Sequence, residues 1–162
     1  MESIAPLLEW LARSELARVM ATSAPARETA ATLHALGAMV VVGAALPLNL
    51  RLLGLWRGVP LADLNRVLSP LILLGFVTTV ASGVALAALR PFALLGMPAV
   101  QAKLALIALL MINALALRLV PAWRMLDQVD SRGTISRFRT AGLISLLAWS
   151  GVLALARWPA LL

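Results

Sequence analysis

Apolar residues are grouped into four long runs along the chain, and most charged residues lie in the segments between them. The runs cover residues about 29–50, 67–89, 100–120 and 140–157. Each is long enough to cross a hydrocarbon core of about 30 Å at about 1.5 Å per residue. Backbone polar groups inside a bilayer must be satisfied internally, so each run predicts a helix. The pattern predicts an all-α fold, with a four-transmembrane-helix bundle over residues 26–162.

The first 22 residues follow a different pattern. Charged residues interrupt every apolar stretch, so the segment lacks the unbroken apolar core of a signal peptide and is too polar to span a membrane. Its apolar residues recur mostly at steps of three and four: Ile4, Leu7, Leu8, Leu11, Val19 and Met20. This spacing predicts one N-terminal amphipathic helix over residues 1–22 that lies in the membrane interface. A soluble helix packed on a partner is the alternative.

Prolines and turn residues mark the breaks between the runs. Pro25 suits the first turn of a helix, Pro47 predicts a kink near the end of the first span, and Pro70 is expected in the first two turns of the second. The connection over 90–98 is short and apolar, whereas that over 121–139 is polar. Within the latter, the letters DSRG predict a turn, and Asp127 and Asp130 are interpreted as counter-charges to the neighbouring arginines.

Composition supports the membrane interpretation. Hydrophobic residues make up 62% of the 162 residues and charged residues 13%, and the mean hydropathy is +0.95. Soluble domains are closer to half apolar and a quarter charged. The chain has no cysteine, which excludes disulfides, thiolate metal sites and cysteine nucleophiles.

The formal net charge is +7. Because the arginines gather at the ends of the apolar runs, membrane topology and anionic headgroups explain this charge, and we expect no nucleic-acid partner. Eight of the 14 basic residues flank the first and third connections: Arg51, Arg57, Arg66, Arg118, Arg124, Arg132, Arg137 and Arg139. The positive-inside rule then predicts that both termini are periplasmic, in a bacterial inner (plasma) membrane.

Four basic residues are expected to meet at one end of the bundle. His34, which is the only histidine, and Lys103, which is the only lysine, each lie one to two turns into a span, while Arg90 and Arg157 close the other two. Intramembrane ionisable groups usually face the bundle interior, so this rim predicts an anion site for a lipid phosphate, a haem propionate, a quinone oxygen or a carboxylate. The structural alternative is a snorkelling Lys103 and a His34 bonded to a neighbouring group, with Glu28 as a further possible partner.

His34 is also a candidate ligand for a metal or haem. With no second histidine, a bis-histidine haem b would need a homodimer or a partner subunit, whereas a five-coordinate haem or a copper ion needs only one. Methionines are present at positions 39, 97 and 111, but Met39 cannot pair with His34 on one helix. Asn113 is the remaining ligand candidate.

Small and hydroxylated residues in the second span predict close helix packing. Gly75, Thr79 and Gly83 recur at four-residue steps and form a ridge along one helix face. We interpret the serines and threonines of the spans, and Asn113, as packing residues rather than a transport path. No span holds an acidic residue, and phosphate-binding loops, paired carboxylates and serine–histidine–aspartate sets are absent from the sequence. We therefore predict no catalytic residues and no enzyme activity.

The segments LHALGAMVVVGAALPLNLRLLGL, LLEWLARS, QAKLALIALLMINALALR and LISLLAWSGVLALARW together resemble a family of small bacterial four-helix membrane proteins of unknown function. This resemblance implies the fold and no activity. More distantly the chain is similar to the membrane part of copper-resistance D-type proteins. This similarity implies an association with copper or with redox proteins. The single histidine departs from any pattern that needs a paired-histidine haem site within one chain.

Three functions therefore compete. The first is an accessory or anchoring subunit of a larger membrane complex, without catalysis of its own, whose partners are the lipid bilayer and other membrane subunits or a second copy. The second is a redox subunit that binds haem b or a quinone near His34. The third is a component of copper or small-solute transport.

Overall fold

The structure, a computed structural model, describes residues 4–126 and 136–157, and the regular elements of these ranges are helices. The two N-terminal helices are α1 (Ala5–Ala12) and α2 (Glu15–Thr22). The four long helices are α3 (Ala24–Leu53), α4 (Leu61–Ala87), α6 (Pro98–Leu119) and α9 (Ser136–Arg157). Two short helices, α5 (Pro91–Leu95) and α7 (Pro121–Arg124), lie in the connections.

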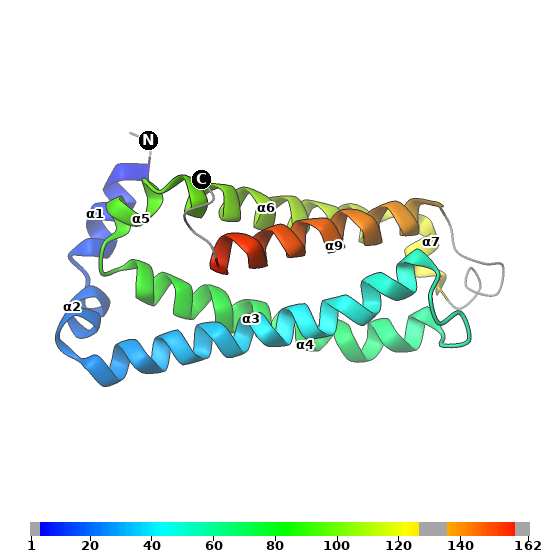
Figure 1. Ribbon diagram of the computed structural model, residues 1–162, viewed down its shortest axis with the longest axis horizontal. Helices are drawn as coiled ribbons and strands as arrows, with labels where there is room; N and C mark the ends of the chain where they lie inside the picture. The colour runs from blue at the N-terminus through cyan, green and yellow to red at the C-terminus, as the bar shows by residue number, and fades with distance from the viewer. Residues whose placement is uncertain (1–3, 127–135, 158–162) are drawn as a thin grey trace.

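The four long helices confirm the predicted all-α bundle. They contain 30, 27, 22 and 22 residues and are apolar enough to cross a membrane. The shortest of them extends about 33 Å at about 1.5 Å per residue, which matches the hydrocarbon core. They run alternately up and down the long axis of the molecule (Figure 1). The chain is therefore a multi-pass membrane protein.

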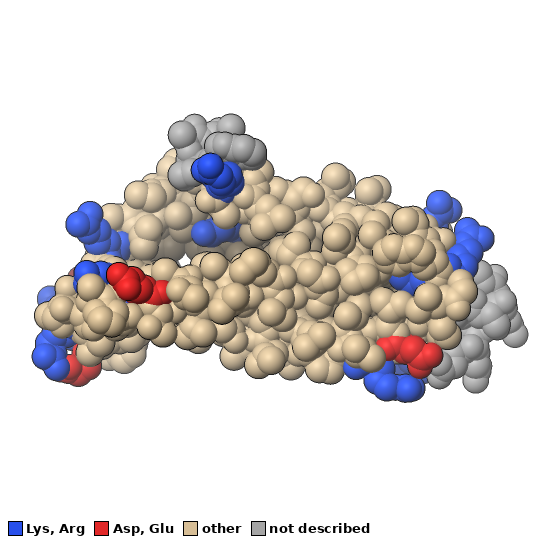
Figure 2. Space-filling model, turned by 60° about the horizontal axis from the view of Figure 1, so that its bottom comes forward, with Lys and Arg blue, Asp and Glu red and all other residues tan. Residues whose placement is uncertain are grey.

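The helices pack in the order α4, α3, α9, α6, since α3 contacts both α4 and α9 and α6 packs along α9. We call one end of the bundle the terminal end. It carries α1, α2 and α5, the first residues of α3 and the last residues of α9 (Figure 1). The opposite end, which we call the loop end, carries residues 54–60 and α7. On the face shown in Figure 2, charged side chains gather at the two ends and the middle is uncharged.

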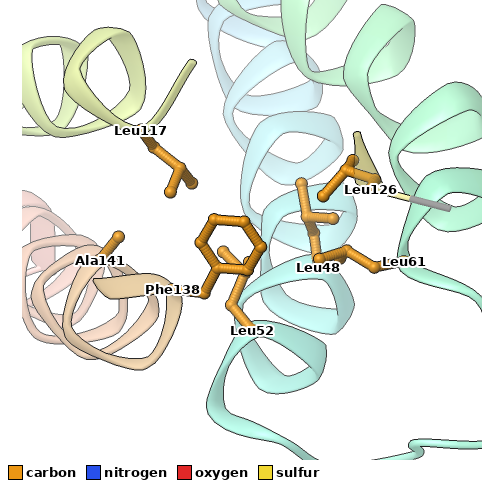
Figure 3. Close-up of a cluster of buried hydrophobic side chains, with 7 residues drawn as sticks. All are labelled: Leu48, Leu52, Leu61, Leu117, Leu126, Phe138 and Ala141. Atoms are coloured by element: carbon orange, nitrogen blue, oxygen red, sulfur yellow. The ribbon is translucent and has the colours of Figure 1, made fainter. Parts of the chain in front are cut away.

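A hydrophobic core ties the long helices together at the loop end. Phe138 of α9 is 2% exposed and forms an edge-to-face contact with Trp123, at a ring-centroid distance of 5.7 Å. Around it lie leucines from α3, α4 and α6 (Figure 3). The cluster comprises Leu48, Leu52, Leu61, Leu117, Leu126, Phe138 and Ala141.

Helix α3 is longer than the predicted span because its two ends carry their own signals. The side chain of Ser23 accepts a hydrogen bond from the Ala26 amide and starts the helix. Gly54, with φ of 102°, ends it in the left-handed conformation that glycine favours. Pro47 lies inside α3, which continues for another six residues.

Two predicted boundaries were wrong. Segment 1–22 is not one helix. The Ser14 side chain donates to the Leu11 carbonyl and accepts from the Ala17 amide, so it ends α1 and begins α2. Pro70 is not near the start of its helix either, because α4 begins at Leu61, whose side chain is 2% exposed in the loop-end core. The predicted turn at 130–133, with Asp127 and Asp130, lies outside the described residues.

Candidate functional site

His34 lies on the side of α3 that packs against α4. Its Nδ1 atom is 2.9 Å from the backbone carbonyl oxygen of Thr79, and the Ser82 hydroxyl oxygen is 3.4 Å from the same nitrogen. The Ser82 hydroxyl donates to the Thr78 carbonyl at 2.6 Å, so towards His34 it presents lone pairs. The imidazole therefore fastens α3 to α4.

This contact decides where the imidazole proton lies. A backbone carbonyl can only accept, so Nδ1 of His34 must carry a hydrogen to form the bond. In the neutral ring Nε2 then holds a lone pair. Within the described residues Nε2 has no hydrogen-bond partner. Fixing one ring nitrogen by a carbonyl while the other stays available is the usual arrangement of a histidine that binds a metal.

Glycines make room for this contact, as the small-residue ridge predicts. A Cβ atom at Gly83 would lie 3.0 Å from Cε1 of His34. Further along, Gly37 of α3 faces Gly75 and Thr79 of α4, and a Cβ at Gly37 would lie 2.5 Å from the Thr79 hydroxyl oxygen. The backbones of the two helices come close here, which small residues permit.

Lys103, Arg90 and Arg157 lie at the terminal end, as their places in the helices require. Arg90 and Arg157 are exposed, whereas Lys103 is half-buried. In the part of the chain that the structure describes, no hydrogen bond or ion pair joins any of these three to His34. Lys103, Arg90 and Arg157 thus lie close to the terminal end, whereas His34 is the eleventh residue of α3 and lies about three turns into the helix, deeper than the predicted one to two turns. The predicted anion site stays a prediction.

Asn113 is used in packing. Its side-chain amide donates to the Ala141 carbonyl at 2.9 Å and joins α6 to α9. His34 and Asn113 therefore have the same role in two different helix pairs. Each donates a hydrogen bond to a backbone carbonyl of the neighbouring helix. In lipid such bonds between helices contribute about 0.6–1.7 kcal/mol each.

Sequence reasoning missed the role of Arg51. It predicted only a charge that flanks the first span, but the side chain is 2% exposed. Its Nε donates to the Val59 carbonyl at 2.7 Å, and one terminal nitrogen lies 3.5 Å from the Arg57 carbonyl. The guanidinium thus shapes the loop over 54–60, in which Trp56 has a φ of 50°. No spacing in the sequence distinguishes this arginine from its exposed neighbours.

The described residues offer no ready-made metal cage. No three histidine, cysteine, aspartate or glutamate side chains among them come together as a ligand set. A surface hollow of about 500 Å³ lies between α1 and α2, and none of the predicted site residues lines it. Its lining comprises Pro6, Glu9, Trp10, Arg13, Ser14 and Glu15.

Comparison with known proteins gives no relative. No family model, curated protein or solved structure matches the chain. The fold and the geometry show that this chain is a four-helix, multi-pass membrane protein. Within its spans, His34 and Asn113 each form a hydrogen bond to a neighbouring helix.

Proposed function

We propose that this protein is an accessory or anchoring subunit of a larger bacterial inner-membrane complex and has no catalysis of its own. The observation that carries the proposal is the use of His34 and Asn113. Both bond to backbone carbonyls of neighbouring helices, so these two polar side chains of the spans hold the bundle together. The positive-inside rule predicts that the loop end is cytoplasmic and that both termini are periplasmic.

The long helices also leave broad apolar faces for other membrane subunits. On α6, for example, Ile112, Leu115 and Leu119 are each at least 60% exposed. In a bilayer such faces contact lipid or the helices of a partner. An anchoring subunit needs this kind of surface and a rigid core, and the loop-end cluster supplies the core.

Site-specific photocrosslinking in native membranes tests this function. A photoreactive residue at the 60%-exposed Leu115 should form one crosslink with a membrane subunit, and the same residue at the 9%-exposed Leu117 is the matched control. The proposal further requires that the crosslinked complex fail to assemble when this chain is deleted. A chain that is monomeric in membranes and active alone would overturn it.

The geometry of His34 favours one second candidate, a redox subunit. With Nδ1 bound to the Thr79 carbonyl, Nε2 is oriented as a ligand for haem iron or as an acceptor for a quinol hydroxyl. The discriminating variant is His34→Asn, whose amide nitrogen reproduces the Nδ1 donor and lacks Nε2. A redox subunit would show a Soret band or an extractable quinone in the parent protein and lose it in His34→Asn; an anchoring subunit would show neither.

A further inference from the structure

The contact between α3 and α9 joins the two halves of the bundle, which are the pair α3 and α4 and the pair α6 and α9. Within each half, one side chain donates directly to a backbone carbonyl of the other helix: His34 to Thr79, and Asn113 to Ala141. Among the described residues, no side-chain hydrogen bond joins α3 to α9. The polar side chains at this contact therefore need a different partner.

Two buried polar side chains at this contact have no partner in the described part of the chain. Asn49 of α3 is 6% exposed, and Ser145 of α9 is 9% exposed. Neither the Asn49 amide nor the Ser145 hydroxyl makes a hydrogen bond to any described residue. Unpaired buried groups cost free energy, and buried polar groups in proteins are nearly always bonded to protein or to an ordered water. The two side chains therefore point to a small ligand between the helices.

Asn49 and Ser145 approach the same place from opposite helices. A Cβ atom at Gly142 would lie 2.9 Å from the carbonyl oxygen of Asn49, so α3 and α9 come very close there. Ser145 follows Gly142 by three residues, about 4.5 Å along the axis of α9 and about 60° around it. The two helices run in opposite directions (Figure 1), and helix side chains lean toward the N-terminus of their own helix. The Asn49 and Ser145 side chains therefore lean toward each other.

Asn113 of α6 reaches the same turn of α9. Its Nδ2 atom donates to the Ala141 carbonyl. In an α-helix this carbonyl also accepts from the backbone N–H four residues later, which belongs to Ser145. The Asn113 amide and Ser145 thus share an acceptor and lie next to each other. The Oδ1 atom of Asn113 makes no hydrogen bond to the described residues, so three helices bring unused hydrogen-bonding groups to one turn of α9.

Water is the ligand that fits these groups. It can accept a hydrogen from the Asn49 amide and donate its own two hydrogens to Oδ1 of Asn113 and Oγ of Ser145. Buried waters typically make about three such bonds. The close approach of the helices at Gly142 favours a small molecule. Two amides and a hydroxyl carry no negative charge, so a metal cation held by them inside a membrane protein would lack a counter-charge.

We propose that one water molecule is bound between α3, α6 and α9, where it bridges Asn49 to Ser145 and Asn113. Through this water, the two halves of the bundle gain the polar link that His34 and Asn113 provide directly within each half. The site lies inside one copy of the chain. It is therefore independent of the anchoring function, and failure of one does not affect the other.

Solid-state NMR of the chain in liposomes tests the site. The sequence contains three asparagines, at positions 49, 65 and 113, so labelling asparagine with nitrogen-15 gives three side-chain amide signals. The signal that is lost in Asn49→Leu identifies Asn49. We expect magnetisation to pass from water to this amide although the side chain is 6% exposed.

A matched pair of serine variants shows whether the water is held as proposed. Ser145→Ala should reduce the transfer to the Asn49 amide by at least half, because the water loses one of its partners. Ser150→Ala removes an exposed hydroxyl from the same helix and should leave the transfer unchanged. These two variants keep Asn49, so this comparison does not depend on how well Asn49→Leu folds.

The sign of a stability change provides a second measurement. If Asn49 had no partner, Asn49→Leu would remove an unpaired polar group and move the midpoint of SDS-induced unfolding to more SDS. A bridging water predicts a shift to less SDS. Combining Asn49→Leu with Ser145→Ala should then cost less than the sum of the two single losses, because both variants break the same bridge.

Three results would overturn the proposal. The first is the absence of water transfer to the Asn49 amide, or a transfer that Ser145→Ala leaves unchanged. The second is an unfolding midpoint that moves to more SDS in Asn49→Leu. The third is a stabilisation by sodium chloride relative to choline chloride that Ser145→Ala abolishes, because the occupant would then be a cation.

Discussion

Nδ1 of His34 on α3 donates to the backbone carbonyl oxygen of Thr79 on α4 across 2.9 Å. Thr79 lies inside α4, where the backbone carbonyls already accept the hydrogen bonds of the helix itself. The imidazole therefore adds a second hydrogen bond to this carbonyl. A bond of this kind links two spans without using a side chain of the second. It also fixes the ring, which leaves Nε2 in a defined direction.

The first prediction concerns this bond. His34→Leu should lower the free energy of unfolding by about 1 kcal/mol, because the bond between α3 and α4 is lost. His34→Asn should keep most of the stability, because its amide can still donate to the Thr79 carbonyl. Reversible unfolding in mixed SDS micelles, followed by circular dichroism, measures both. Equal losses in the two variants would mean that the hydrogen bond does not support the helix contact.

The second prediction concerns the glycine contact of α3 and α4. Gly37→Ala places a Cβ 2.5 Å from the Thr79 hydroxyl oxygen and 2.9 Å from the Gly75 carbonyl oxygen. Because backbone cannot move aside cheaply, we expect a loss of about 1–3 kcal/mol. Gly43→Ala on the same helix is the control, since nothing lies within 4 Å of its added Cβ. That variant should be neutral or more stable by up to about 1 kcal/mol, because alanine favours a helix. The same unfolding assay applies.

The third prediction concerns the end of α3. Gly54 has a φ of 102°, so Gly54→Ala should cost about 1–2 kcal/mol from backbone strain. Gly58→Ala, four residues on in the same loop, meets nothing within 4 Å and serves as the control. Comparing the two thermal unfolding midpoints in detergent checks the difference. If both variants melted alike, the left-handed cap would not limit stability.

The fourth prediction concerns the buried guanidinium of Arg51. Arg51→Met removes the donor to the Val59 carbonyl from a site that is 2% exposed, so the free energy of unfolding should fall by at least about 2 kcal/mol. Arg66→Met is the control, because the Arg66 side chain is 77% exposed and its contact with Asp63 is long, at 3.4 Å. An exposed pair of this kind contributes less than about 1 kcal/mol. Proteolysis of the loop over 54–60 should accelerate only in Arg51→Met.

The fifth prediction concerns orientation. The native chain has no cysteine, so single-cysteine variants can be labelled without a background. Arg157→Cys at the terminal end should react with a membrane-impermeant maleimide added to intact spheroplasts. Trp56→Cys, which replaces a 54%-exposed side chain at the loop end, should react only after the membrane is opened. The reverse labelling pattern would place both termini in the cytoplasm.

Much of the fold could be predicted from hydropathy alone. The four spans follow from it because no other structure satisfies the backbone in lipid. Boundaries were harder, since polar residues extend α4 back to Leu61 and Ser14 divides the first segment. The ridge of Gly75, Thr79 and Gly83 could be recognised from its spacing, but not that Gly37 is its counterpart on α3.

The sequence by itself determined that this chain has four helices able to span a membrane and that few polar groups lie within them, because both follow from length and apolar patterning. The tertiary structure alone decided the partners of those groups. His34 bonds to α4, Asn113 to α9 and Arg51 to its own loop. Each acceptor is a backbone carbonyl, and every residue has one. Such a partner therefore cannot be recognised from the sequence, and it is identified only once the packing of the helices is known.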